Sequence, residues 1–159
     1  MIINQRFEYK KYPHTAVEML GLETLKRFIF FSNHFHQYCS VNTFNISPKL
    51  EVFGSDSDVL ISEVLKRDKG SLKVLDISVS RYFKINGTPS QSCSNLQVLS
   101  FHSEKSYVID SSIMNWILSL KNLREIWTNN DPLFYSSTNN IKKYLTSKKI
   151  FLFKFNFFF

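Results

Sequence analysis

Hydrophobic side chains recur along this chain in one short phrase, with a large apolar residue at its first, fourth and sixth places. Five copies supply fifteen such places, and thirteen of them are apolar in a chain that is 43% hydrophobic. Ser55 and Thr128 fill the other two. The leading leucines are 25, 22, 24 and 27 residues apart, a spacing typical of repeat proteins. The copies are Leu25–Phe30, Leu50–Ser55, Leu72–Ile77, Leu96–Phe101 and Leu123–Thr128.

The phrase predicts short strands, because alternate side chains of an extended segment point to the same side. One such strand cannot bury its apolar row alone, whereas copies stacked in a parallel sheet can. Helical patterns occur at residues 58–70, 110–120 and 139–147, with a short one at 14–21. Residues 79–94 predict a loop, and residues 32–48 are ambiguous. The sequence therefore predicts an α/β solenoid of five to six repeats.

Three regions follow from this pattern. Residues 1–21 flank the repeats and include the short helix, and residues 22–148 hold the repeats. Residues 149–159 are either a last strand, with Ile150, Phe153 and Phe155 as its apolar row, or a truncated or non-natural tail. An exposed run of phenylalanines at this end would favour aggregation.

The strands also resemble a known superfamily. The residue three places after each third apolar position is polar: Asn33, Asp58, Ser80, Glu104 and Asp131. Leucine-rich repeats place Asn or Cys there, where the side chain satisfies backbone groups at the strand exit. Because the repeats are poor in glycine and carry helices, residues 20–131 resemble the ribonuclease-inhibitor-like branch of that superfamily.

Within that branch, the segment from Ser71 to Ser78, followed by a long loop and Asn95-Leu-Gln-Val-Leu, resembles the Zyg-eleven family. The resemblance implies a substrate receptor of a cullin–RING ubiquitin ligase, and so a link to the components of such a ligase. The ligase-docking segment and the armadillo-type region of that family would lie outside this chain. F-box proteins and plant immune receptors carry comparable strands, so an immune-type sensor stays an alternative.

Residues between the buried places should line the concave face of the solenoid. Five strands about 5 Å apart give a surface about 20 Å across, which suits a peptide or protein epitope. Trp, Phe and Arg are frequent anchors of interfaces, although Trp127 could instead pack against Val98 or a flanking loop. The predicted partner-binding residues are Arg27, Phe31, Asp56, Asp76, His102, Glu125, Trp127 and Asn129.

Metal and catalytic chemistry find little support. His34, His36 and Cys39 could supply three zinc ligands, but no second pair lies at a useful spacing. Cys93 falls three places before Leu96, a position that predicts burial, so its thiol should point away from His102. Four glycines cannot form a Gly-rich phosphate loop. We expect no metal, no cofactor and no enzymatic activity.

Charge leaves one competing function open. The net charge is +7, from 20 Lys and Arg against 13 Asp and Glu. Basic residues interleaved with aromatics, as in single-strand nucleic-acid binders, occur at Lys66, Arg67, Lys69, Lys73, Arg81, Tyr82, Phe83 and Lys84. The predicted concave face is not especially basic, which favours a protein partner over nucleic acid.

The setting follows from what the sequence lacks. Two cysteines do not form a disulfide framework, and no apolar stretch has the length of a signal peptide or a membrane span. We therefore expect a cytoplasmic or nuclear protein that does not act at a membrane. The sequence therefore predicts a non-enzymatic protein-recognition module.

Overall fold

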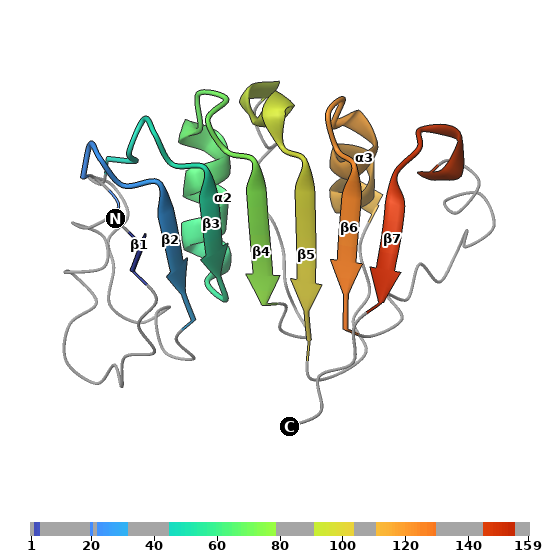
Figure 1. Ribbon diagram of the computed structural model, residues 1–159, viewed down its shortest axis with the longest axis horizontal. Coiled ribbons are helices and arrows are strands. Elements are labelled where there is room, and N and C mark those ends of the chain that lie inside the picture. Colours follow the sequence, from blue (N-terminus) through green and yellow to red (C-terminus); the bar gives the residue numbers. More distant parts are fainter. Residues whose placement is uncertain are drawn as a thin grey trace.

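The computed structural model describes residues 2–3, 20, 22–31, 45–78, 91–103, 111–129 and 145–154. These residues form one sheet of seven strands that lie side by side in chain order, each parallel to the next (Figure 1). The strands are β1 (Ile2–Ile3), β2 (Arg27–Phe30), β3 (Val52–Ser55), β4 (Val74–Ser78), β5 (Val98–His102), β6 (Glu125–Thr128) and β7 (Phe151–Lys154). β1 lies in the segment that the sequence predicted only to flank the repeats.

Helices lie on one side of this sheet. Helix α2 (Asp58–Arg67) follows β3, the 3-10 helix η3 (Gln91–Asn95) precedes β5, and helix α3 (Ser111–Ser119) precedes β6. In Figure 1, α2 and α3 lie behind the sheet. The alternation of parallel strands with helices confirms the predicted α/β class, and it is compatible with a solenoid-like arrangement.

The ends of the helices follow their capping residues. α2 begins where the Ser57 side chain accepts a hydrogen bond from the Leu60 N–H, so the cap lies one residue before the predicted Asp58. Lys66 and Arg67 occupy its last turn, where cations stabilise the helix dipole. The prediction of a loop at 79–94 is wrong for residues 91–94, which belong to η3. Residues 145–147 of the predicted helix 139–147 are helical, and so is Leu20 of the predicted helix 14–21.

Several predictions fall outside the described residues. They concern the strand-exit residues Asn33, Ser80, Glu104 and Asp131, the three zinc-ligand candidates, and the basic and aromatic residues 81–84.

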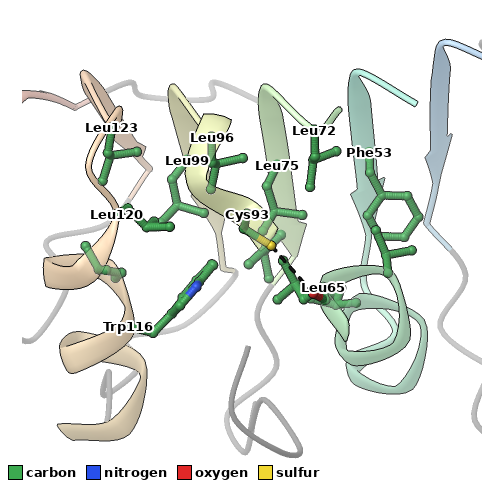
Figure 2. Close-up of a cluster of buried hydrophobic side chains, with 14 of the residues drawn as sticks. Phe53, Leu65, Leu72, Leu75, Cys93, Leu96, Leu99, Trp116, Leu120 and Leu123 are labelled. Atoms are coloured by element: carbon green, nitrogen blue, oxygen red, sulfur yellow. Dashed lines mark hydrogen bonds between the residues drawn. The ribbon is translucent and has the colours of Figure 1, made fainter. Parts of the chain in front are cut away.

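The predicted core positions stack in register. Phe53 of β3 pairs laterally with Leu75 of β4, which in turn pairs with Leu99 of β5. All fifteen first, fourth and sixth places are buried, with at most 4% of any residue exposed, including Ser55 and Thr128. Figure 2 shows Phe53, Leu75 and Leu99 extending from the strands toward the helices, where Leu65 and Trp116 meet them. These fifteen stacked places are called the buried column below. Burial of each Leu or Phe side chain contributes about 1.5–3 kcal/mol, so the buried column is the main source of stability.

A backbone motif recurs where each strand begins. One carbonyl oxygen accepts two N–H groups of the next copy at 2.8–3.1 Å, and this is repeated from β2 through β6. The four carbonyls belong to Lys26, Glu51, Lys73 and Gln97. The same places of successive copies thus have the same backbone environment as well as the same burial.

The last strand departs from that motif. Arg124 O accepts only the Phe151 N–H, while the Ile150 N–H bonds to Leu145 O, after a left-handed Lys149 with φ of 56°. Strand β7 is the sixth strand that the sequence predicted as one possibility, but Leu152 rather than Phe153 pairs with Ile126. The predicted apolar row of this strand is therefore wrong by one residue.

Candidate functional site

The candidate site is the open face of the sheet, defined here as the side opposite α2 and α3. Its side chains come from the places between the buried ones, and most are half-buried. The register aligns them in three rows across the strands. The first row is Arg27, Val52, Val74, Val98, Glu125 and Phe151, the middle row is Ile29, Gly54, Asp76, Ser100, Trp127 and Phe153, and the third is Phe31, Asp56, Ser78, His102 and Asn129.

Three polar side chains meet at the centre of this face. His102 Nε2 lies 2.5 Å from Asp76 Oδ1 and 3.0 Å from Ser100 Oγ. Asp76 and Ser100 are lateral neighbours on β4 and β5, and His102 follows Ser100 by two residues on the same face. The Asp76 contact has ion-pair distance but not hydrogen-bond geometry, so Oδ1 is a buried acceptor without a hydrogen-bond donor. The side chains of Asp76 and His102 are 23% and 24% exposed, so both reach solvent.

This arrangement resembles a catalytic triad in composition but not in geometry. In a triad, the carboxylate orients one imidazole nitrogen while the serine hydroxyl approaches the other. Here both oxygens approach the same nitrogen, Nε2. A nitrogen that faces the carboxylate is poorly placed to take the Ser100 proton as a general base. The cluster is better suited to hydrogen bonding and charge recognition.

Gly54 lets side chains close over the sheet beside that cluster. A Cβ at Gly54 would lie 3.2 Å from Ile29 Cγ2 and 3.3 Å from Asp76 Cβ, tighter than an ordinary van der Waals contact. The missing side chain is thus replaced by the carbons of Ile29 and Asp76, which come from the two neighbouring strands. Asp76 is held between an apolar side and the polar pair of β5.

An aromatic pair forms the β7 end of the face. The rings of Trp127 and Phe153 stack with centroids 4.5 Å apart and planes 22° apart. The indole N–H of Trp127 donates to Glu125 Oε2 at 2.9 Å, so the ring orientation is fixed from two sides. Phe153 remains 37% exposed and Phe151 63% exposed. Trp127 therefore stacks on Phe153, whereas the sequence had named Val98 or a flanking loop as its alternative packing partner.

The opposite end of the face carries Phe31 and Arg27. Phe31 follows β2 and is 44% exposed. Arg27 Nε is buried without a hydrogen-bond partner. Apolar surface is therefore available at both ends of the face, with the Asp76 cluster between them.

The side-chain amide of Asn129 bonds to the backbone and therefore has a structural role. Its Oδ1 accepts the Ser103 N–H and its Nδ2 donates to Ser103 O, both at 2.9 Å. These two bonds tie together the ends of β5 and β6. Asn129 satisfies backbone groups at a strand exit, which is the role predicted for Asp131 two residues later.

Other asparagines link successive copies at the strand entry. Asn95 Nδ2 donates to Gly70 O and Asn122 Nδ2 donates to Ser94 O, each at 2.7 Å. Both asparagines immediately precede the leading leucine of a copy, a position that the sequence reasoning did not single out. The regular spacing from that leucine was the signal available to find them.

The structure gathers Asp76 and His102 in one cluster, and Glu125 and Trp127 in another, while Arg27 and Phe31 lie at the far edge. Sequence reasoning missed Ser100 in the first cluster and Phe153 in the second. Cys93 is buried as predicted, and its Sγ contacts Leu65 O on the helix side, away from His102 (Figure 2). The residue three places before the leading leucine is not buried in the first copy, where Leu22 is 42% exposed.

The charge of the open face opposes that of the chain. Its described side chains include one basic residue, Arg27, and three acidic residues, Asp56, Asp76 and Glu125, so one minus three gives −2 against +7 for the whole chain. On α2, Lys66 and Arg67 pair with Glu63 at 2.8 Å and 3.1 Å. A negative face repels nucleic-acid phosphates, so the geometry does not favour the nucleic-acid alternative for this face.

Two features are absent from the described part of the chain. Within it, no group of three His, Cys, Asp or Glu side chains could hold a metal ion. Among the same residues, no helix has both the length and the apolar character needed to cross a bilayer. In comparisons with known proteins, no family model matches the chain, and neither the curated proteins nor the solved structures give a match.

Proposed function

We propose that the chain is a leucine-rich-repeat solenoid of five to six repeats whose open face binds a protein segment without catalysing a reaction. The observation that carries this proposal is the alternation within β2, β4, β5 and β6. One set of places is apolar or small and buried, while the other set is half-buried, and its middle row differs chemically from copy to copy. Such a surface combines a rigid scaffold with varied contacts, which recognition of a partner requires.

The clusters on this face support the proposal further. Trp127 and Phe153 are large, partly exposed and held in place by stacking, which lowers the entropy lost on binding. The polar cluster around Asp76 supplies directional contacts about 10 Å away, two strands along the sheet. An aromatic anchor beside fixed polar groups is the usual anatomy of a binding hot spot.

The resemblance to ubiquitin-ligase receptors gives the proposal its setting. We propose that the bound segment belongs to a substrate of a cullin–RING ligase in the cytoplasm or nucleus. Within that setting, the open face selects the substrate and other parts of the receptor contact the ligase.

Affinity capture from native extract tests the function. The full chain is used because β7 supplies Phe153, and it is compared with Trp127→Ala and with Asn115→Ala on α3, which is exposed on the helix side. We expect specific proteins that stay bound at raised salt, with Trp127→Ala weakening them by tenfold or more, in the range of an interface hot spot. Asn115→Ala should bind as the unchanged chain does.

Thermal unfolding of each variant serves as the control for stability. If Trp127→Ala only lowers the unfolding temperature and retains the same proteins, the anchor role is wrong. Recovery of nucleic acid that washes off with salt would replace the proposal with the basic-cluster alternative. Cullin-complex components among the retained proteins would support the setting.

A further inference from the structure

The unbalanced charge of the open face restricts what can cover it. Among the described side chains of the face, a covering partner removes three acids, Asp56, Asp76 and Glu125, and one cation, Arg27, from water. Taking this excess of negative charge out of water costs free energy, although Asp76 and Glu125 each have a contact within the face. A segment that carries a positive side chain compensates this cost.

Asp76 is the acid best placed to receive that side chain. It lies in the middle row near the centre of the sheet, and its carboxylate is 23% exposed. Glu125, in contrast, already accepts the Trp127 N–H. Asp76 Oδ1 is buried against His102 Nε2, so an incoming cation reaches the carboxylate through its partly exposed remainder and shares it with His102.

The surroundings of Asp76 suit a long cationic side chain. Ile29 and the Gly54 backbone lie on one side of it, and Ser100 on the other. The methylene groups of a Lys or Arg side chain can pack on the apolar side while the charged end reaches the carboxylate. Arg adds donors that can reach both Asp76 and the Ser100 oxygen.

A second contact lies two strands away. The Trp127–Phe153 pair presents a partly exposed aromatic surface in the same row as Asp76, about 10 Å along it. An extended peptide advances about 3.3 Å per residue, so about three residues span that distance. One short segment can therefore contact both clusters.

On the basis of the proposed function, we infer that the open face binds a basic, aromatic-containing protein segment. Its Lys or Arg side chain pairs with Asp76, and an aromatic side chain a few residues away packs on Trp127 and Phe153. The inference names the chemistry of the partner, which the proposed function leaves open.

Synthetic peptides test the inference directly. The probes are acetylated ten-residue Gly/Ser peptides with one Arg and one Phe separated by one to four residues. In a matched set, citrulline replaces Arg, which removes the charge while keeping the shape. Binding is measured by titration at about 0.15 M salt, where exposed long-range electrostatics is largely screened.

We expect at least one Arg-containing spacing to bind the unchanged chain about tenfold or more tightly than its citrulline counterpart, the range for a charge-assisted bond. Asp76→Asn should abolish that preference, so that the Arg and citrulline peptides bind alike. Glu63→Gln changes the net charge by the same amount on α2 and should leave the preference intact.

Three outcomes would overturn the inference: an Arg preference that persists in Asp76→Asn, an equal loss of preference in Glu63→Gln, or no binding by any peptide up to about 1 mM. Failure of the inference can be distinguished from failure of the proposed function. If Arg and citrulline peptides bind equally and Trp127→Ala weakens both, the open face still binds protein segments and only the cationic contact is wrong.

Discussion

The two faces of the sheet are built from the same strands, yet they follow different rules. On the helix side, the places occupied by Phe53, Leu75 and Leu99 form one uninterrupted apolar column. On the open face, the neighbouring places hold Gly54, Asp76 and Ser100, which share no chemistry. The buried places are repeated in each copy, whereas the middle row of the open face differs from copy to copy, which is the pattern that the proposed recognition requires. The open face is therefore the side of the sheet whose residues vary most between copies.

Substitutions at two adjacent residues of β4 give the most severe test of this comparison. Leu75→Asp places a charge in the buried column and should abolish cooperative unfolding, because the cost approaches the total stability of a small domain. Asp76→Leu, the next residue, should leave the transition in place. Circular dichroism during thermal unfolding checks both. A cooperative transition in Leu75→Asp would mean that the two faces are assigned incorrectly.

Two phenylalanines test the same distinction without a charge. Phe53 is fully buried at the centre of the column, and Phe151 is 63% exposed in the first row of the open face. Phe53→Ala should lower the free energy of unfolding by about 3–5 kcal/mol through lost burial and a cavity. Phe151→Ala should change it by about 0.5 kcal/mol or less. Urea titration measures both values, and equal losses would contradict the comparison.

Asn129 sharpens the comparison because it lies on the open face but acts on the backbone. Asn129→Ala removes two hydrogen bonds to Ser103 and should cost about 1–3 kcal/mol of stability. Partner binding per folded molecule should not change. Denaturant titration together with a binding titration separates the two effects. Weaker binding with full stability would show that Asn129 belongs to the recognition surface after all.

The smallest expected effect lies on α2. Burial raises the pKa of Glu63, but hydrogen bonds and charges from Lys66 and Arg67 outweigh it and lower the pKa below its usual value. A lowered folded-state pKa gives stability that is present above the unfolded pKa of about 4.3 and is lost as the pH falls through the folded value.

The Glu63→Gln variant should lose about 0.3–0.5 kcal/mol at pH 7, the range for exposed helical ion pairs. The difference between the unchanged chain and the variant should shrink as the pH falls below about 4. Denaturant titrations at pH 7 and pH 3 provide the check. A difference that grows toward acid pH would contradict the assigned pKa direction.

The buried column could be predicted because it depends on residue type and spacing alone. Leu75 and Ile77 are apolar at alternate places, which an extended segment turns to one side, and a leucine such as Leu72 recurs at the start of each copy. Even Ser55 and Thr128, which lack the apolar character, are buried because their neighbours fix the register. A repeated pattern thus predicts burial at the places where single residues are ambiguous.

The register of β7 could not be predicted for the opposite reason. Phe151 and Phe153 fall on one side of the strand and Ile150 and Leu152 on the other, so both sides are apolar and residue type does not distinguish the two registers. The choice depends on the left-handed backbone at Lys149, a conformation that its side chain does not indicate. The stacking of Phe153 on Trp127 therefore emerged only from the structure.

Two members of the Asp76 cluster, Asp76 and His102, were predicted as binding residues, but Ser100 and the contacts among the three were not. The sequence placed Asp76 and His102 on one face. The lateral register pairs Asp76 with Ser100, and Ser100 then contacts His102, two residues later on the same strand. Contacts across strands depend on the length of the crossover that precedes each strand, which a pattern within one strand does not contain. Spacing predicts the face, and only the register predicts the neighbours.

The measurement that tests the central claim most directly places one arginine on each face. Ser100→Arg puts a bulky cation at the centre of the open face, and Asn115→Arg makes the same charge change on α3. With both variants folded, Ser100→Arg should weaken binding of the partner or the Arg-containing peptide tenfold or more, and Asn115→Arg should leave it unchanged. Equal binding by the two variants, or a loss confined to Asn115→Arg, would contradict recognition by the open face.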